Sequence, residues 1–102
     1  FLNTNSLKGF LINQMSQSPQ LQHVIINCSS ISSIDFSALE MLEDMNSELN
    51  KLNIRLHFSE VKGPVMDKLQ HSKLLKHLSG QIYLTHYQAI QDLSSSTAEY
   101  QI

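Results

Sequence analysis

Hydroxyl and carboxylate side chains crowd one stretch of the sequence, residues 28–39. An apolar run able to form a buried strand leads into it, and residues 35–38 (Asp-Phe-Ser-Ala) can open a helix. A hydroxyl at a helix N-terminus faces free backbone N–H groups and the positive end of the helix dipole, which favours a bound anion or an attached phosphate. Ser37 is therefore a candidate site for phosphorylation or for binding a nucleotide or anion.

A simpler interpretation of the same stretch is structural. Ser33, Asp35 or Ser37 can cap the helix, a role that serine and aspartate fill constantly. The turn around them is also a candidate docking loop for a partner. The members of that loop are Ser29, Ser30, Ser32, Ser33, Asp35 and Phe36.

Two charged helix faces are candidate partner-binding surfaces, although ordinary solvation explains each more simply. Clustered acids on a rigid helix attract a basic partner, and a basic helical region suits an acidic protein, a nucleotide or anionic lipid headgroups. The acidic face holds Glu40, Glu43, Asp44 and Glu48, and the basic face holds Lys62, Lys68, Lys73 and Lys76.

Motifs for catalysis and metal binding are absent from the sequence. It contains no Gly-rich phosphate loop, no His-x-x-x-His pair and no Cys-x-x-Cys, and its five histidines fall on different expected elements. No nucleophile has a neighbouring base by spacing. A net charge of −2 lacks the basic excess of a nucleic-acid-binding domain. We expect no catalytic residue, no metal, no cofactor and no nucleic-acid partner.

Size and composition predict one globular domain. The 102 residues are 41% hydrophobic and 16% charged, and no apolar run approaches the roughly 20 residues of a membrane helix. The chain itself is expected to be soluble. Its start on Phe1, without a methionine, suggests a piece of a longer protein. The single cysteine, Cys28, is expected to be a buried small hydrophobe in a reducing compartment.

Periodicity predicts alternating helices and strands. Strands are expected at 21–27, covered on both faces, at 54–58, covered on one face, and at 82–84. Helices are expected at 6–16, 37–52, 64–78 with a break near 71–72, and 86–93 after a Thr85 cap. Residues 94–102 are polar and are expected to form a frayed tail.

Several of these motifs resemble the STAS domain, named for sulphate transporters and anti-sigma-factor antagonists. The similarity runs over residues 1–93 and is most specific in three places: 25–39, 56–65 with its Lys-Gly-Pro-Val turn, and 69–75 together with 82–85. The turn and the Tyr-Leu-Thr sequence at 83–85 are most similar to the version attached to SulP anion transporters.

The resemblance implies an α/β fold with a STAS-like mixed β-sheet of about four strands flanked by helices. It implies a domain over 1–93 whose first strand is truncated at Phe1, with 94–102 as a tail. It further implies the cytoplasmic C-terminal regulatory and interaction domain of a sulfate or other inorganic anion transporter, at the cytoplasmic face of the inner (plasma) membrane. Its partners would be the transporter's own membrane domain and a cytosolic regulatory protein.

A second function is compatible with the resemblance, that of a free-standing anti-sigma factor antagonist switched by a kinase. Ser37 matches the serine phosphorylated in that branch. Phe36 stands where a small hydroxyl residue is usual, and Ala38 where glycine is usual. These departures favour a docking surface over a phosphorylation site.

Overall fold

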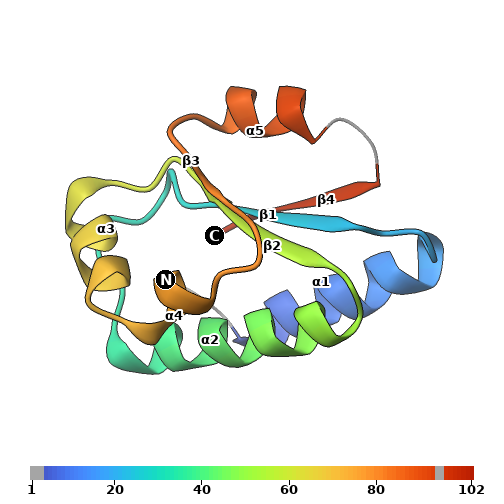
Figure 1. The fold of residues 1–102 in the computed structure, drawn as a ribbon, viewed down its shortest axis with the longest axis horizontal. Helices are drawn as coiled ribbons and strands as arrows, with labels where there is room; N and C mark the ends of the chain where they lie inside the picture. The colour runs from blue at the N-terminus through green and yellow to red at the C-terminus, as the bar shows by residue number, and fades with distance from the viewer. Residues whose placement is uncertain (1–3, 94–95) are drawn as a thin grey trace.

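The protein is a single layer of parallel strands with helices on both faces (Figure 1). The computed structural model describes residues 4–93 and 96–102. Its sheet has the order β3-β2-β1-β4, with strands β1 His23–Asn27, β2 Arg55–Ser59, β3 Ile82–Tyr83 and β4 Thr97–Gln101. The helices are α1 Thr4–Gln17, α2 Phe36–Lys51, α3 Gly63–Gln70, α4 Lys73–His77 and α5 His86–Asp92.

Strand β1 lies at the centre of the core. Val24, Ile25 and Ile26 are fully buried, as expected for a strand covered on both faces. Alternate side chains face opposite ways, so Val24 and Ile26 join the larger cluster on the side of α1 and α2, while Ile25 packs with Tyr83 and Ala89 under α5. Figure 1 shows α5 above the sheet and α1, α2 and α4 below it.

Helix α2 forms where the periodicity predicts. Leu39, Leu42, Met45 and Leu49 recur at three and four residues and are buried on one side of the helix. Asp35 caps the N-terminus of α2. Asn53, just beyond the C-terminus of the helix, takes the left-handed conformation with φ 61°. None of the helices in residues 4–93 has the length and apolar character needed to cross a membrane.

The predicted fold class is confirmed, with four strands flanked by helices, but the pairing differs in detail. Every strand pair among the described residues is parallel, whereas a mixed sheet was expected. The strand expected at Phe1 lies outside the described residues. Strand β2 was expected to be covered on one face, which is wrong, because His57 and Ser59 are buried as completely as Leu56 and Phe58.

The prediction of a frayed tail is also wrong for the part of 94–102 that the structure describes. Residues 97–101 form β4, which pairs with the whole length of β1, from His23 beside Thr97 to Asn27 beside Gln101. The polar sequence of β4 does not predict a strand, because the contacts that stabilise β4 are made with distant residues. Its ladder partners belong to β1, Ala98 is buried, and Tyr100 packs on Phe10 with ring centroids 5.0 Å apart.

Gly80 provides a test of the packing between β2 and β3. A Cβ there would lie 2.2 Å from the Leu56 carbonyl oxygen and 2.5 Å from His57 Nδ1, and the backbone oxygen cannot move aside cheaply. We expect Gly80→Ala to lower the free energy of unfolding in urea by about 2 kcal/mol. Gly9→Ala, with nothing within 4 Å of the new methyl group, should instead raise it by about 1 kcal/mol. Equal effects of the two changes would contradict this packing.

Candidate functional site

The carboxyl ends of all four strands meet at one edge of the sheet. The register places Asn27 beside Ser59 and Gln101, and Ser59 beside Tyr83. In open parallel sheets this edge is where ligands and partners usually bind, because the loops that leave it are free to vary. The candidate docking loop leaves the sheet here, directly after β1.

The docking loop is held from below by apolar side chains. Residues 28–35, hereafter the serine loop, bury Cys28, Ile31 and Ile34 in the core. Burial raises the pKa of the Cys28 thiol to about 12, as expected for a cysteine that packs as a small hydrophobe. With these three side chains turned inward, the predicted docking residues of the loop all face solvent, namely Ser29, Ser30, Ser32, Ser33 and Asp35.

Hydrogen bonds fix the serine loop from two sides. Lys62, in the turn after β2, donates from Nζ to the Ser29 carbonyl oxygen at 2.5 Å. Gln101, at the end of β4, donates from Nε2 to Ser30 Oγ at 3.0 Å and to Ser29 Oγ at 3.2 Å. The Ser29 N–H donates to Asn27 Oδ1 at 2.9 Å. The loop is therefore ordered before any partner arrives, which lowers the entropy cost of binding.

The start of α2 resolves which residue caps it. Asp35 Oδ1 accepts a hydrogen bond from the Ala38 N–H at 2.8 Å, so the carboxylate occupies the helix N-terminus. Ser37 is exposed in the first turn. An anion or a phosphate at Ser37 would meet the charge of Asp35 next to it and of Glu40 one turn on, and like charges at this spacing repel.

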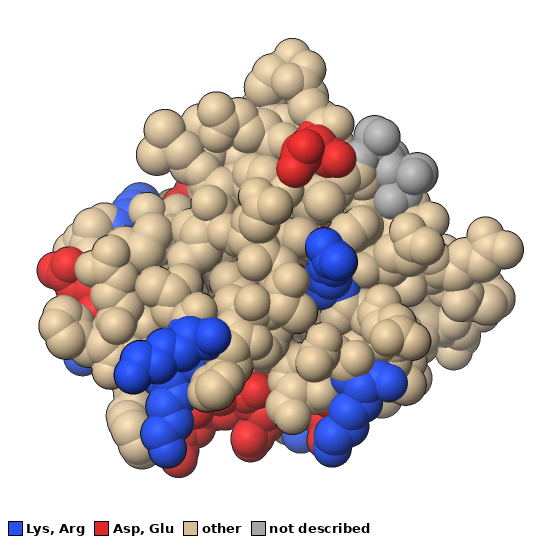
Figure 2. Space-filling model, in the orientation of Figure 1, with Lys and Arg blue, Asp and Glu red and all other residues tan. Residues whose placement is uncertain are grey.

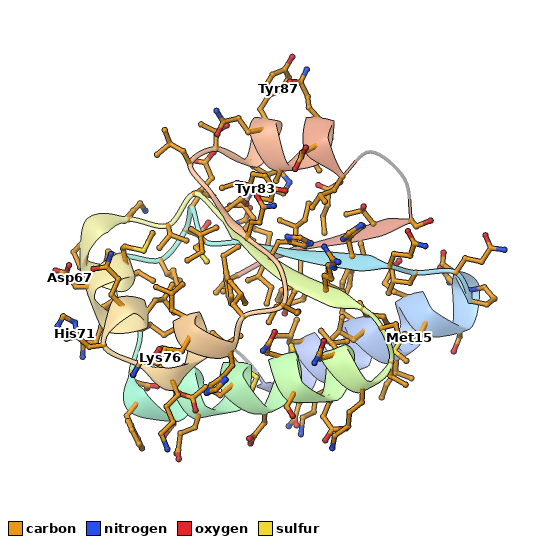
Figure 3. The ribbon with its side chains drawn as sticks, in the orientation of Figure 1. Met15, Asp67, His71, Lys76, Tyr83 and Tyr87 are labelled. Atoms are coloured by element: carbon orange, nitrogen blue, oxygen red, sulfur yellow. The ribbon has the colours of Figure 1, made fainter. Side chains whose placement is uncertain are left out.

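Phe36, the first residue of α2, borders a groove between α2 and α3. This α2–α3 groove has a volume of about 710 Å³ and is lined by Phe36, Leu39, Glu40, Glu43, Pro64, Asp67, Lys68, His71, Ser72 and Lys73. It joins members of the predicted acidic and basic faces. Figure 3 shows Asp67 and His71 on the outer side of α3, and Figure 2 shows lysines over α4 beside carboxylates of α2.

The two charged faces are not the separate patches that the sequence suggested. Glu40 and Glu43 lie in the α2–α3 groove, together with Lys68 and Lys73. Asp44 and Glu48 line a different groove on the other side of α2, and Glu40 borders both grooves. Lys62 reaches the serine loop instead, and Lys76 is exposed on α4 (Figure 3). Acidic and basic side chains of the two predicted faces therefore share the α2–α3 groove.

Sequence reasoning missed a chain of polar groups beside this edge. Ser59 Oγ lies 2.7 Å from His86 Nδ1, and His86 Nε2 lies 2.7 Å from Glu99 Oε1. Serine, imidazole and carboxylate in this order can activate a nucleophile, but Ser59 is 0% exposed and its hydroxyl cannot reach a substrate. This polar network instead links β2, α5 and β4, and the His86 N–H donates to the Glu60 carboxylate at 2.8 Å.

A second missed pair is His23 and His57, whose ring nitrogens Nδ1 and Nε2 lie 3.0 Å apart. The Gln81 N–H donates to His57 Nδ1 at 3.0 Å, so His57 carries its proton on Nε2 and donates it to His23. Burial first, then His23 and Arg55, lowers the pKa of His57 to about 4, against a raising influence of Asp92.

Metal binding finds no counterpart in the described residues. No group of three or more His, Cys, Asp or Glu side chains among them is placed to hold a metal ion. Only the strand register brings His23 and His57 together, and their spacing of 34 residues gives no signal in the sequence.

The fold agrees with what comparison of the sequence shows. Residues 1–89 match the STAS domain family, and the chain belongs to that family. Among its relatives is the probable sulfate transporter 3.4 of Arabidopsis thaliana, 37% identical over 78 residues that make up 74% of this chain and 12% of the relative. The high affinity sulfate transporter 2 of Stylosanthes hamata is 27% identical over 111 aligned residues, which cover 98% of this chain and 17% of the relative.

A third relative is sulfate transporter 3.2 of Arabidopsis thaliana, 31% identical over 71 residues, or 69% of this chain and 11% of the relative. The chain thus spans less than a fifth of the length of each of these relatives. The similarity makes it a STAS domain of the kind found in sulfate transporters.

The His23–His57 pair predicts a loss of stability in mild acid. The pKa of His57 falls from 6.5 to about 4 on folding, so the unfolded chain binds more protons between these values. The contribution of His57 to the free energy of unfolding is fully present above pH 6.5, where the ring is neutral in both states. As pH falls from 6.5 toward 4, the free energy of unfolding decreases by up to about 3 kcal/mol. Urea unfolding at a series of pH values measures this. His57→Gln should flatten the profile in this window, and an unchanged profile in this variant would contradict the prediction.

Proposed function

We propose that this domain is a regulatory and protein-interaction domain of a SulP-type sulfate transporter, without catalytic activity of its own. Its place would be the cytoplasmic face of the plasma membrane, joined to the transporter's membrane domain. Membership in the STAS family and similarity to three plant sulfate transporters support the attachment. The burial of Ser59 and the lowered pKa of His57 support a structural role for the two histidine clusters.

The exposure of Phe36 is the observation that carries the interaction role. Its side chain is 72% exposed, although a phenylalanine gains about 1.5–3 kcal/mol from full burial. It stands at the junction of the serine loop and the α2–α3 groove, both of which are built from fixed elements. An exposed aromatic side chain on a rigid base has the character of a binding hot spot.

The alternative function, a phosphorylation switch at Ser37, gains less from the geometry. The carboxylate of Asp35 already satisfies the helix N-terminus that would attract a phosphate or a nucleotide. Phosphorylation would add about −1.5 to −2 charge next to that carboxylate. A docking surface centred on Phe36 requires no such addition, so we place the serine loop and Phe36 in contact with the partner.

Transport by the full-length protein tests the role of Phe36. We expect Phe36→Ser to lower sulfate uptake severalfold in cells that lack their own sulfate transport, with the amount of protein at the membrane unchanged. Removing an exposed side chain should alter folding stability by no more than about 0.5 kcal/mol. The matched control is Tyr87→Ser, because Tyr87 is 70% exposed on the side of α5 that points away from the sheet (Figure 3).

Uptake by the Tyr87 variant should equal that of the unchanged protein. The interaction role would be wrong if Phe36→Ser also left uptake per transporter unchanged. A purified Phe36→Ser domain with the same unfolding midpoint as the parent domain would show that any loss is not a folding defect.

A further inference from the structure

A second groove lies between α1 and α2, on the opposite side of α2 from the α2–α3 groove. This α1–α2 groove has a volume of about 820 Å³. Its apolar lining comes from both helices and from the residue that follows α2: Leu11, Ile12, Met15, Met41, Met45, Leu49 and Leu52. Figure 3 shows Met15 on α1 beside the C-terminal half of α2.

The groove leaves large apolar side chains uncovered. Ile12 is 67% exposed on α1 and Leu52 is 54% exposed just beyond α2, so the groove has an apolar residue on each side. Met15 and Met41 between them are half-buried. Three of the chain's four methionines line this single groove. Methionine is flexible and polarisable, and surfaces rich in it adapt to helices of different sequence.

The rim of the groove is acidic. Glu40, Asp44 and Glu48 follow one another at four-residue spacing along α2, and all three are exposed. Lys8 on α1 is the one cation that lines the groove among the described residues. Lys51, just outside the lining, lies 3.7 Å from Glu48 and offsets its charge. Glu40 and Asp44 against Lys8 still leave the rim negative, which favours a basic partner and repels an anionic membrane surface.

We propose that the α1–α2 groove binds an amphipathic, basic helix of a separate protein. The apolar face of that helix would lie on the methionines, and its lysines or arginines would face Glu40, Asp44 and Glu48. This is the usual way in which a helix occupies an apolar groove. The adaptable methionines suit partners that exchange. The inference rests on the proposed interaction function and adds a second contact surface with a partner of defined chemistry.

Neither charged helical region of a second copy supplies such a helix among the described residues. The basic region from α3 to α4 has its apolar residues Val65, Leu69 and Leu74 packed in the core, so it cannot present an apolar face while folded. Helix α2 itself is acidic and would repel the rim.

Peptide binding to the 102-residue chain tests the proposal. The probe is a fluorescein-labelled helical peptide of two Leu-Lys-Lys-Leu-Leu-Lys-Leu heptads, and its match is the same peptide with glutamate for lysine. We expect the lysine peptide to bind at micromolar concentration and the glutamate peptide at least tenfold more weakly. The double variant Glu40→Lys, Asp44→Lys should lose at least tenfold in affinity for the lysine peptide. The double variant Glu43→Lys, Asp67→Lys is the matched control, because it changes the net charge equally and both residues lie outside this groove.

Methyl NMR of labelled methionines locates the binding. The signals of Met15, Met41 and Met45 should shift with the lysine peptide, while that of Met66 on α3 should not. Equal binding of both peptides, an unaffected double variant, or shifts confined to Met66 would overturn the proposal. A dimer of the chain that Ile12→Asp converts to monomer would identify a second copy as the occupant and would also overturn it.

The full-length protein tests whether an attached segment of the same chain occupies the groove. A Phe36 variant tests whether the groove binds independently of the proposed Phe36 surface. If the three methionine signals already stand at their peptide-bound positions there, an attached segment fills the groove and the separate-protein proposal is wrong. Phe36→Ala should leave peptide affinity unchanged, because Phe36 does not line this groove. Suppose that the unchanged chain does not bind the lysine peptide but Phe36→Ser still lowers sulfate uptake. The helix-binding inference would then be wrong, while the proposed interaction function would stand.

Discussion

The parallel pairing of β1 with β2 on one side and β4 on the other is the constraint on which the rest of the structure depends. It buries Val24, Ile25 and Ile26 completely and so creates the two layers of the core. Parallel strands need helices across their faces, since neither side of a buried apolar strand can meet water. The positions of α1 and α2 on one face and α5 on the other follow from this requirement.

The same pairing sets the geometry of the candidate site. It brings Asn27, Ser59 and Gln101 into one row, so the serine loop receives hydrogen bonds from Lys62 after β2 and from Gln101 of β4. The face of the sheet under α5 is more polar, and its side chains form networks around His57 and His86. The candidate edge is therefore exposed, and hydrogen bonds from two neighbouring elements hold its serine loop.

Sequence reasoning predicted what local chemistry decides. The apolar period of α2, the helix break after Gln70, the Thr85 cap and the exposed serines needed only neighbouring residues. It failed where the decisive partner is distant in sequence. Residues 97–101 reveal no strand until β1 is placed beside them, and His57 gives no sign of burial until Gly80 and Gln81 cover it. The α1–α2 groove likewise depends on how two helices are spaced, which periodicity does not report.

The hydrogen bond from Gln101 to the serine loop also bears on the order in which the domain is synthesised and folds. A chain is synthesised from its N-terminus, and the amide of Gln101 follows the hydroxyl of Ser30 by 71 residues. Until β4 has been made and has joined the sheet, the loop lacks the amide that holds its serines. A partner that recognises the ordered loop therefore distinguishes a finished domain from one still emerging from the ribosome.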